Sequence, residues 1–199
     1  GSDLIGSAIA IDLSKQFEVT VADKSNEALS RLDRCFGIKT VKIDVTERKK
    51  LENLIAPFNI VIGAMPADIS YDIIKRVIEC NKNMVDISFF PGSITELANR
   101  AKYKKVTLVI DCGIAPGLSN MIAGFHTINM KVEKFECFIG GLPVERRWPW
   151  QYKAIYHPHD VIKEFLTPAR FIENGKQIAK EAFTDPEFIH IDGIGTLEA

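Results

Sequence analysis

Along residues 1–112, stretches with apolar residues three or four positions apart alternate with short runs that are apolar almost throughout. The amphipathic stretches predict helices that begin near Leu4, Asn26, Glu47, Ile69 and Ile94. The runs between them are "FEVTVAD", "IKTVKID", "FNIVIGA", "MVDISF" and "VTLVIDC". Runs of this kind are typical of strands buried on both faces of a parallel sheet. The alternation predicts right-handed βαβ units and hence an α/β fold with a Rossmann-type, doubly wound parallel sheet.

After about residue 130 the pattern changes to shorter strand-like pieces and a single helix. The helix is expected from about His159 to Phe165, and Asn174-Gly175 predicts a tight hairpin turn. The strand-like pieces are "EKFECFIGG", "QYKAIYH", "ARFIENGK" and "EFIHIDGIG". We therefore predict a Rossmann domain over 1–115 and a mixed α+β domain over 116–199, with Pro116 in the first turn of a helix.

Composition and charge narrow the range of partners. The chain has 199 residues, is 46% hydrophobic and has a net charge of −1, so we expect a globular protein that recruits neither nucleic acid nor an anionic membrane. It contains no apolar run long enough to cross a bilayer, and we expect it to be cytoplasmic. The four cysteines are scattered singly, which is typical of neither a zinc cluster nor a disulfide framework. We expect no metal site.

The chain begins with "GSDLIG", which resembles the G-x-G-x-x-G loop of dinucleotide-binding folds. Gly1 and Gly6 occupy the first and third glycine positions, and Leu4 and Ile5 lie between them. Asp3 occupies the second position, where a side chain crowds the pyrophosphate and a carboxylate repels it unless it turns toward solvent. By itself, the loop is weak evidence for a nucleotide site.

Acidic residues at the ends of the next two strands support a cofactor site. Asp23 lies about twenty residues after the loop, where a carboxylate would bind the adenosine ribose and disfavour a 2′-phosphate. This position favours NAD over NADP, although Lys24 and Ser25 are of the kinds that bind a 2′-phosphate. The alternative is that Asp23 caps the following helix. Asp44, with Val45, could border the adenine pocket or could equally be a cap.

A fourth segment, "GAMP", completes the predicted cofactor site. It follows the strand of "FNIVIGA" and shapes a turn at the carboxyl edge of the sheet, which is the edge where open α/β sheets bind ligands. The cofactor-binding residues that we expect there are Gly63, Ala64, Met65 and Pro66.

Three later segments carry a family resemblance: "VIDCGIAPGLSNMIAG", "FIGGLP" and "LTPARFIENGK". With them, the whole chain resembles the saccharopine dehydrogenase family, and most closely its lysine 6-dehydrogenase-like branch. The resemblance implies an NAD(P)-dependent oxidoreductase that acts on the C–N bond of an amino acid, with L-lysine or a related amine as substrate. It also implies a strand before Gly1, further sequence after residue 199, and assembly as a homo-oligomer such as a homodimer.

One position departs from the saccharopine reductases that the chain also resembles. They tend to carry an acidic residue just before the Pro-Gly pair, whereas this chain has Ala115. The difference favours the lysine 6-dehydrogenase-like branch. A saccharopine reductase-type dehydrogenase and a non-catalytic nucleotide-binding or scaffold homologue remain the alternatives.

Candidate catalytic groups lie where the predicted strands of the first domain end. They are Asp86 and Ser88 in "VDISF", and Asp111 and Cys112 in "IDCGIAPG", which precedes a helix start whose free amides would suit an anion. In the second domain, His157 has the most useful intrinsic pKa for proton transfer. The alternative for the carboxyls is structural hydrogen bonding, and for the thiol inert packing.

Candidate substrate-binding residues lie in the second domain. Arg146 could bind a substrate carboxylate in bidentate fashion, and since Arg147 is adjacent, at least one of the two should face solvent. Tyr152 follows in the same polar and aromatic segment. The resemblance singles out Thr167 and Arg170 in "TPAR" for substrate contact.

Overall fold

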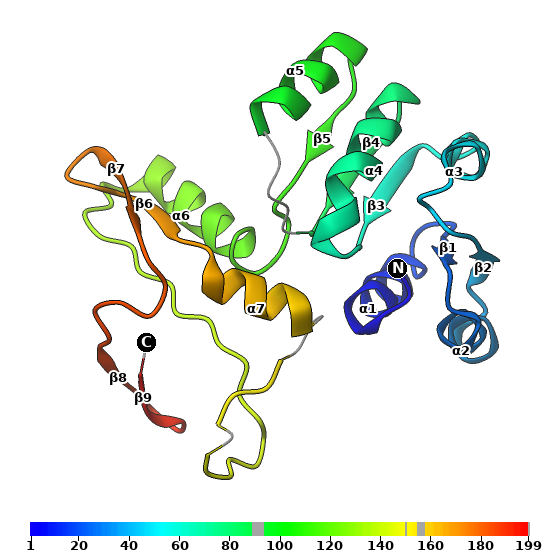
Figure 1. Ribbon diagram of the computed structural model, residues 1–199. Coiled ribbons are helices and arrows are strands. Elements are labelled where there is room, and N and C mark those ends of the chain that lie inside the picture. The colour runs from blue at the N-terminus through cyan, green and yellow to red at the C-terminus, as the bar shows by residue number, and fades with distance from the viewer. Residues whose placement is uncertain (89–93, 150, 155–157, 199) are drawn as a thin grey trace. The chain divides into compact units, whose positions relative to one another are not determined.

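The computed structural model describes residues 1–88, 94–149, 151–154 and 158–198 (Figure 1). The chain divides into two compact units, Gly1–Glu133 and Lys134–Ala199, which are described separately. These units are defined by compactness, whereas the boundary predicted between residues 115 and 116 separates two domains. That boundary therefore stays a prediction. Among the described residues, no helix is both long enough and apolar enough to span a membrane.

Unit 1 alternates helix and strand from its first residues to α6. The five helices predicted in this region begin within two residues of their expected starts, since apolar spacing and capping residues define helix starts well. The elements are α1 (Leu4–Leu13), β1 (Thr20–Asp23), α2 (Asn26–Phe36), β2 (Lys39–Lys42), α3 (Arg48–Ile55), β3 (Ile60–Gly63), α4 (Ala67–Glu79), β4 (Asn83–Asp86), α5 (Ile94–Lys104), β5 (Leu108–Val109) and α6 (Leu118–Asn129).

All strand pairs in unit 1 are parallel, which confirms the α/β, Rossmann-like fold class. The strands form two sheets, β1-β2 and β3-β4-β5, instead of the single sheet that the alternation predicts. β1 and β3 do not pair with each other, and the loop at Gly1 lies between their carboxyl ends. A Cβ on Gly1 would lie 2.2 Å from the Ala64 carbonyl oxygen and 3.9 Å from Asp23 Oδ2.

Two apolar clusters hold unit 1 together. The larger lies between α3, α4 and α5 and the strands β4 and β5, with Ile74, Val77 and Leu97 fully buried. The smaller joins α1, α2 and β1 around Leu32. Helix α2 is strongly amphipathic, begins at the cap Ser25 and ends at Gly37, whose φ of 64° favours glycine. Each cluster therefore anchors one of the two sheets and positions its carboxyl edge.

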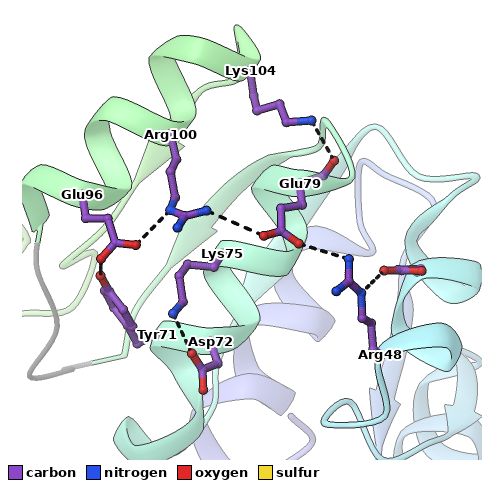
Figure 2. Close-up of polar contacts among 9 residues, drawn as sticks. Arg48, Tyr71, Asp72, Lys75, Glu79, Glu96, Arg100 and Lys104 are labelled. Atoms are coloured by element: carbon purple, nitrogen blue, oxygen red, sulfur yellow. Dashed lines mark hydrogen bonds and ion pairs between the residues drawn. The ribbon is translucent and has the colours of Figure 1, made fainter.

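The exposed side of α3, α4 and α5 carries a network of charged side chains (Figure 2). Arg100 bridges Glu96 at 2.9 Å and Glu79 at 3.7 Å, both on the α4–α5 side. Arg48 extends the network from α3, at 3.4 Å from Glu79. The Tyr71 hydroxyl donates to Glu96 at 2.7 Å. Because these groups face solvent, they link the helices without contributing much stability.

In its described residues, unit 2 contains one helix and two antiparallel hairpins. Asn174 and Gly175 have φ angles of 49° and 75°, which confirms the predicted tight turn between the first pair of strands. The helix confirms the prediction at 159–165. The elements are α7 (Pro158–Leu166), β6 (Ala169–Glu173), β7 (Lys176–Lys180), β8 (Phe188–Ile191) and β9 (Gly195–Glu198).

Two of the predicted strands in the second half are wrong in the part of the chain that the structure describes. Neither "EKFECFIGG" nor residues 151–154 of "QYKAIYH" form a strand. Apolar alternation suits a strand, but a strand also needs a partner for its backbone groups. A single backbone hydrogen bond joins the described parts of the two segments, from the Lys153 N–H to the Gly141 carbonyl at 2.9 Å.

The predicted place of Pro116 is also wrong. Helix α6 begins at Leu118 and its N-cap is Gly117, so Pro116 precedes the cap and lies outside the first turn. The cap has a φ of 136°, which favours glycine, and a Cβ there would lie 2.1 Å from the Gly113 carbonyl oxygen. The close approach of these two glycine backbones decides where the helix starts.

Candidate functional site

The glycine loop packs tightly against its neighbours at the start of α1. A Cβ on Gly6 would lie 2.2 Å from the Gly1 carbonyl oxygen, and one on Gly1 would be equally close to Ala64. A side chain on Gly1 would force the loop away from the turn after β3, and one on Gly6 would collide with the loop itself. Leu4 and Ile5 form the first turn of α1 and are exposed. The loop thus has the close backbone approach that a dinucleotide site requires.

Asp3 caps α1 instead of turning away from it. Its Oδ1 accepts a hydrogen bond from the Gly6 N–H at 2.8 Å. The amides at this helix end are the groups that would bind a cofactor phosphate. The carboxylate therefore occupies one of them and places a negative charge where the phosphate would bind.

Asp23 connects the glycine loop to the end of β1. Its Oδ2 accepts from the Ser2 N–H at 2.6 Å, and its Oδ1 accepts from the Ser25 N–H at 2.8 Å. Burial alone would raise the pKa of Asp23, but the hydrogen bonds from Ser25 and Ser2 outweigh it and lower that pKa. Each oxygen keeps a lone pair with which a ribose hydroxyl could bond. The helix-capping alternative is wrong, because the N-cap of α2 is Ser25.

A hollow of about 830 Å³ lies at this end of unit 1, next to the starts of α1 and α2. Its lining includes Ser2, Asp3, Ser25, Asn26 and Arg31. Lys24 is exposed nearby in the sequence. Ser2 and Ser25 of this lining donate their N–H groups to Asp23, so the hollow lies next to that carboxylate.

Asp44 closes the turn between β2 and α3. Its Oδ1 accepts from the Thr46 N–H at 2.9 Å and from the Thr46 hydroxyl at 2.6 Å, and these bonds lower the pKa of Asp44. The N-cap of α3 is Glu47, so Asp44 is not the cap. Val45 is half-buried against the larger apolar cluster. The adenine-pocket role of both residues stays a prediction.

The carboxyl ends of β3 and β4 meet at Gly63 and Asp86, which are opposite each other in the parallel register. Asp86 is 0% exposed, and a Cβ on Gly63 would lie 1.8 Å from its Oδ2. The Asp86 Oδ1 accepts from the Ser88 N–H at 2.8 Å, and the Met65 N–H donates to the Ser88 hydroxyl at 3.3 Å. The predicted cofactor turn and two predicted catalytic residues are thus in contact.

The other residues of that turn serve as packing or capping groups. Ala64 is buried, whereas Pro66 is exposed and is the N-cap of α4. Met65 packs partly against the larger apolar cluster. The cofactor-binding role of these three residues stays a prediction.

Asp86, the last residue of β4, and Asp111, which follows β5, both have raised pKa values. Burial raises the pKa of Asp86, and the nearby charge of Asp111 raises it further, while hydrogen bonds from Ser88 oppose the shift. Burial likewise raises the pKa of Asp111, which is half-exposed and has a φ of 55°. A raised pKa moves a carboxyl toward the range in which it can exchange protons near neutral pH.

The loop from Asp111 to Gly117 uses the amides at the start of α6. The Leu118 N–H donates to Gly113 and the Ser119 N–H donates to Ile114, both at 3.0 Å. The Gly117 N–H donates to Asn120 Oδ1, also at 3.0 Å. The prediction that free amides here suit an anion is therefore wrong, because the loop's own carbonyls and Asn120 accept their hydrogen bonds.

Cys112 sits at the start of this loop with its backbone held by β4. Its N–H donates to the Asp86 carbonyl oxygen at 3.1 Å, and its thiol is free and half-buried. Among the described residues, no group of three or more metal-ligating side chains occurs. Its predicted catalytic role stays a prediction.

The predicted substrate residues of unit 2 have different surroundings. Arg146 is half-buried, while Arg147 is exposed and pairs with Glu145 at 2.8 Å, which confirms that one of the two arginines faces solvent. The Tyr152 ring packs edge-on against Phe165, with centroids 5.8 Å apart. The Thr167 hydroxyl donates to the Lys163 carbonyl at 2.8 Å and so closes the last turn of α7.

The other two predicted residues of unit 2, Arg170 and His157, have side chains outside the described residues. Arg170 lies in β6, opposite Ala179, and its side chain lies outside the described residues. His157 lies wholly outside them.

Sequence reasoning missed the fit between Gly63 and Asp86 and the bond between Ser88 and Met65. A usable signal was present in the spacing of "DIS", because an aspartate often accepts a hydrogen bond from the backbone two residues on. "DKS" at 23–25 and "DVT" at 44–46 carry the same spacing and make the same bond. The contact with Met65 has no local signal, because 23 positions separate the two residues.

Comparisons with known proteins cover nearly the whole chain. Residues 1–109 match the family model described as the saccharopine dehydrogenase NADP binding domain, and residues 113–198 match the saccharopine dehydrogenase C-terminal domain. The mitochondrial alpha-aminoadipic semialdehyde synthase of Rattus norvegicus is 26% identical over 189 residues, which are 89% of this chain and 20% of that protein. The saccharopine dehydrogenase [NADP(+), L-glutamate-forming] of Saccharomyces cerevisiae is 24% identical over 165 residues, 79% of this chain and 37% of that protein.

A solved structure supports the fold. The apo saccharopine dehydrogenase (L-Glu forming) from Saccharomyces cerevisiae matches with a TM-score of 0.69 at 19% identity, over 96% of this chain and 46% of that one. The chain spans less than half the length of each of these relatives.

Proposed function

Since the chain belongs to the saccharopine dehydrogenase family, we propose that it forms the cofactor-binding part of an NAD(P)-dependent oxidoreductase that acts on the C–N bond of an amino acid. One observation carries the proposal. The glycine loop lies between the carboxyl ends of β1 and β3, and Asp23 accepts a hydrogen bond from its Ser2 N–H. This arrangement fits the adenosine half of a dinucleotide.

We propose that NAD binds more tightly than NADP. The hydrogen bonds that lower the pKa of Asp23 keep it charged at neutral pH, and that charge repels a 2′-phosphate while its oxygens suit ribose hydroxyls. The yeast relative and the matching domain are named for NADP, which supports the opposite preference. Arg31, beside the hollow, is the cation that would favour a 2′-phosphate.

The proposed reaction is oxidative deamination of L-lysine or a related amine. The nicotinamide, when bound, accepts the hydride that leaves the carbon bearing the amine, and water then releases the carbonyl. The protein must accept the proton of the amine. Asp111 supports this role, because its carboxyl is half-exposed at a strand end and its pKa is raised by burial. Asp86 is too deeply buried to contact a substrate.

A saccharopine reductase-type activity is the second candidate. The names of the two matching relatives favour it, whereas Ala115 lacks the acidic group that such enzymes tend to carry before Pro-Gly. A product assay that compares lysine with saccharopine, with the protein to which these residues belong, separates the two activities. Turnover of saccharopine alone would contradict the lysine proposal.

A non-catalytic nucleotide-binding homologue is the third candidate, and Asp3 is the observation that favours it. Its carboxylate binds the Gly6 amide at the start of α1 and would compete with a cofactor phosphate. Tight NAD binding without turnover of any amine would support this candidate over the two enzymes.

Calorimetric titration of the chain with NAD and, separately, NADP tests the cofactor proposal. We expect binding of NAD with at least tenfold preference, about 1.4 kcal/mol. The variant Asp3→Gly should bind NAD more tightly than the native chain, because it frees the Gly6 amide and removes a negative charge. No binding of either cofactor by both proteins would overturn the proposal.

A further inference from the structure

The carboxyl of Asp86 has one buried oxygen without a hydrogen-bond partner. The residue is 0% exposed, and its Oδ2 makes no hydrogen bond in the described structure. Among the described residues, no ion pair involves Asp86. Burying such a group costs stability, so its presence calls for a physical explanation.

Gly63 makes room for this carboxyl. A Cβ at residue 63 would lie 1.8 Å from Asp86 Oδ2 and 2.7 Å from Met84 Cε, so only glycine lets the carboxyl lie against β3. The backbone on both sides holds the arrangement: the Ile87 N–H donates to the Gly63 carbonyl at 3.1 Å. The carboxyl is therefore enclosed between two strands and cannot reach a ligand directly.

The other oxygen of Asp86 acts on Ser88. The Ser88 N–H donates to Asp86 Oδ1 at 2.8 Å, so the carboxyl fixes the backbone of Ser88. A serine hydroxyl has a single proton and two lone pairs. One of these lone pairs accepts the Met65 N–H, which donates to Ser88 Oγ at 3.3 Å. Asp86 therefore fixes the residue whose hydroxyl holds Met65.

Met65 lies in the turn of residues 63–66 between β3 and α4. We propose that Asp86 is a positioning residue, which acts through Ser88 to hold this turn in the conformation that binds the cofactor. The identity of the cofactor rests on the proposed function. The hold on the turn, meaning the hydrogen bonds from Met65 to Ser88 and from Ser88 to Asp86, does not. Ser88 is 6% exposed, so water competes little for its hydroxyl.

The direction of the pKa shift agrees with this role. Burial raises the pKa of Asp86, so the carboxyl stays neutral to a higher pH than an exposed aspartate would. Asp111 is the charged group that faces it, and its charge acts in the same direction. In either protonation state, Oδ1 can accept from Ser88, so the geometry of Ser88 does not depend on the charge.

Amide hydrogen exchange at Met65 in the free protein tests the hold on the turn without any cofactor. We expect Ser88→Ala to speed the exchange of the Met65 amide about tenfold, the loss of one buried hydrogen bond. Asp86→Ala should have a similar effect, because it removes the acceptor that fixes the Ser88 backbone. Asp86→Asn should keep most of the protection, because its side-chain oxygen can still accept from Ser88.

A matched control and a double variant separate positioning from general damage to the fold. Ser70→Ala removes an equally buried hydroxyl that donates to the Ala67 carbonyl at 3.2 Å within α4, and it should leave Met65 protected. Asp86→Ala with Ser88→Ala should exchange no faster at Met65 than Ser88→Ala alone, since both act on one bond. If Asp86→Ala does not fold, Ser88→Ala and Asp86→Asn still decide the outcome.

Cofactor titration of the same variants links the turn to binding. We expect Ser88→Ala to weaken NAD binding roughly three- to tenfold and Asp86→Asn to restore nearly native affinity. Unchanged Met65 exchange in Ser88→Ala, or a Ser70→Ala effect of the same size, would overturn the positioning role. If the native chain binds neither NAD nor NADP while Met65 exchange responds as expected, the proposed function fails and the hold on the turn stands.

Discussion

Asp23 and Asp86 end parallel strands of unit 1 and share a local motif, but their pKa values shift in opposite directions. Both are followed by a serine two positions on, and in both the Oδ1 accepts from that serine's N–H at 2.8 Å. The Oδ2 of Asp23 accepts a second N–H, from Ser2, whereas the Oδ2 of Asp86 has no partner. The pKa of Asp23 is lowered and that of Asp86 is raised.

The two serines differ in the same way. The Ser25 hydroxyl accepts from the Ala28 N–H and caps α2, a contact within one element. The Ser88 hydroxyl accepts from the Met65 N–H, a contact between two segments. An identical motif therefore stabilises a helix end at one strand and holds a turn at the other. The surroundings of the motif, and not its local geometry, decide its role.

The largest effect is expected from Gly63→Ala, because it places a methyl group against the Asp86 carboxyl. The new Cβ would overlap the buried carboxyl and the Met84 methyl, and neither can retreat toward solvent. We expect a loss of about 2–3 kcal/mol in the free energy of unfolding, measured by urea titration. Gly124→Ala in α6, where a Cβ would meet nothing within 4 Å, is the control and should not destabilise. Equal stability of the two variants would contradict the close fit.

Asp23→Asn removes the negative charge at the end of β1. We expect the ratio of NADP to NAD affinity to rise about tenfold, or about 1.4 kcal/mol, because the repulsion of a 2′-phosphate disappears. Calorimetric titration with both cofactors measures the ratio. Asp33→Asn, at an exposed position of α2, should leave the ratio unchanged. A ratio that stays constant in Asp23→Asn would exclude this carboxylate as the selecting group.

The pH dependence of stability should separate the two aspartates. Because the folded state holds the Asp86 proton more tightly than the unfolded chain does, stability falls as the pH rises from about 4 through the raised pKa. Asp23 has the opposite sign, because its contribution is lost as the pH falls through its lowered pKa. Urea midpoints across this range should fall more steeply in the native chain than in Asp86→Asn, where Asp111, whose pKa is also raised, still contributes. The same slope in both proteins would place the titrating group elsewhere.

The smallest effect is expected in the exposed network of α4 and α5. Arg100→Met removes the cation that joins Glu96 and Glu79 in Figure 2, yet keeps the apolar stem. We expect a slight loss of stability that vanishes in concentrated salt, since solvent screens exposed charges. Urea titration at low and high salt measures it. A loss as large as that of Gly63→Ala would mean that the network matters as much as the buried carboxyl.

Much of the fold follows from local pattern. The starts of five helices, the parallel pairing of β1 with β2, of β3 with β4 and of β4 with β5, and the turn at Asn174-Gly175 agree with the spacing of apolar, capping and turn residues. The strand predicted at 133–141 did not form in the described residues, because its apolar spacing says nothing about a partner strand. The same holds for the α6 amides, whose partners are carbonyls of a loop that only the folded backbone brings into reach.

The sequence by itself determined which residues end the strands and which hydrogen bonds each makes within two positions, because such contacts depend on local backbone geometry alone. It therefore placed Asp23, Asp44 and Asp86 at the carboxyl edge. Only the tertiary structure decided that Asp86 is enclosed by Gly63 while Asp23 stays within reach of solvent. Burial and long-range hydrogen bonds depend on segments that are distant in the chain, and they shift the pKa values of the two carboxyls in opposite directions.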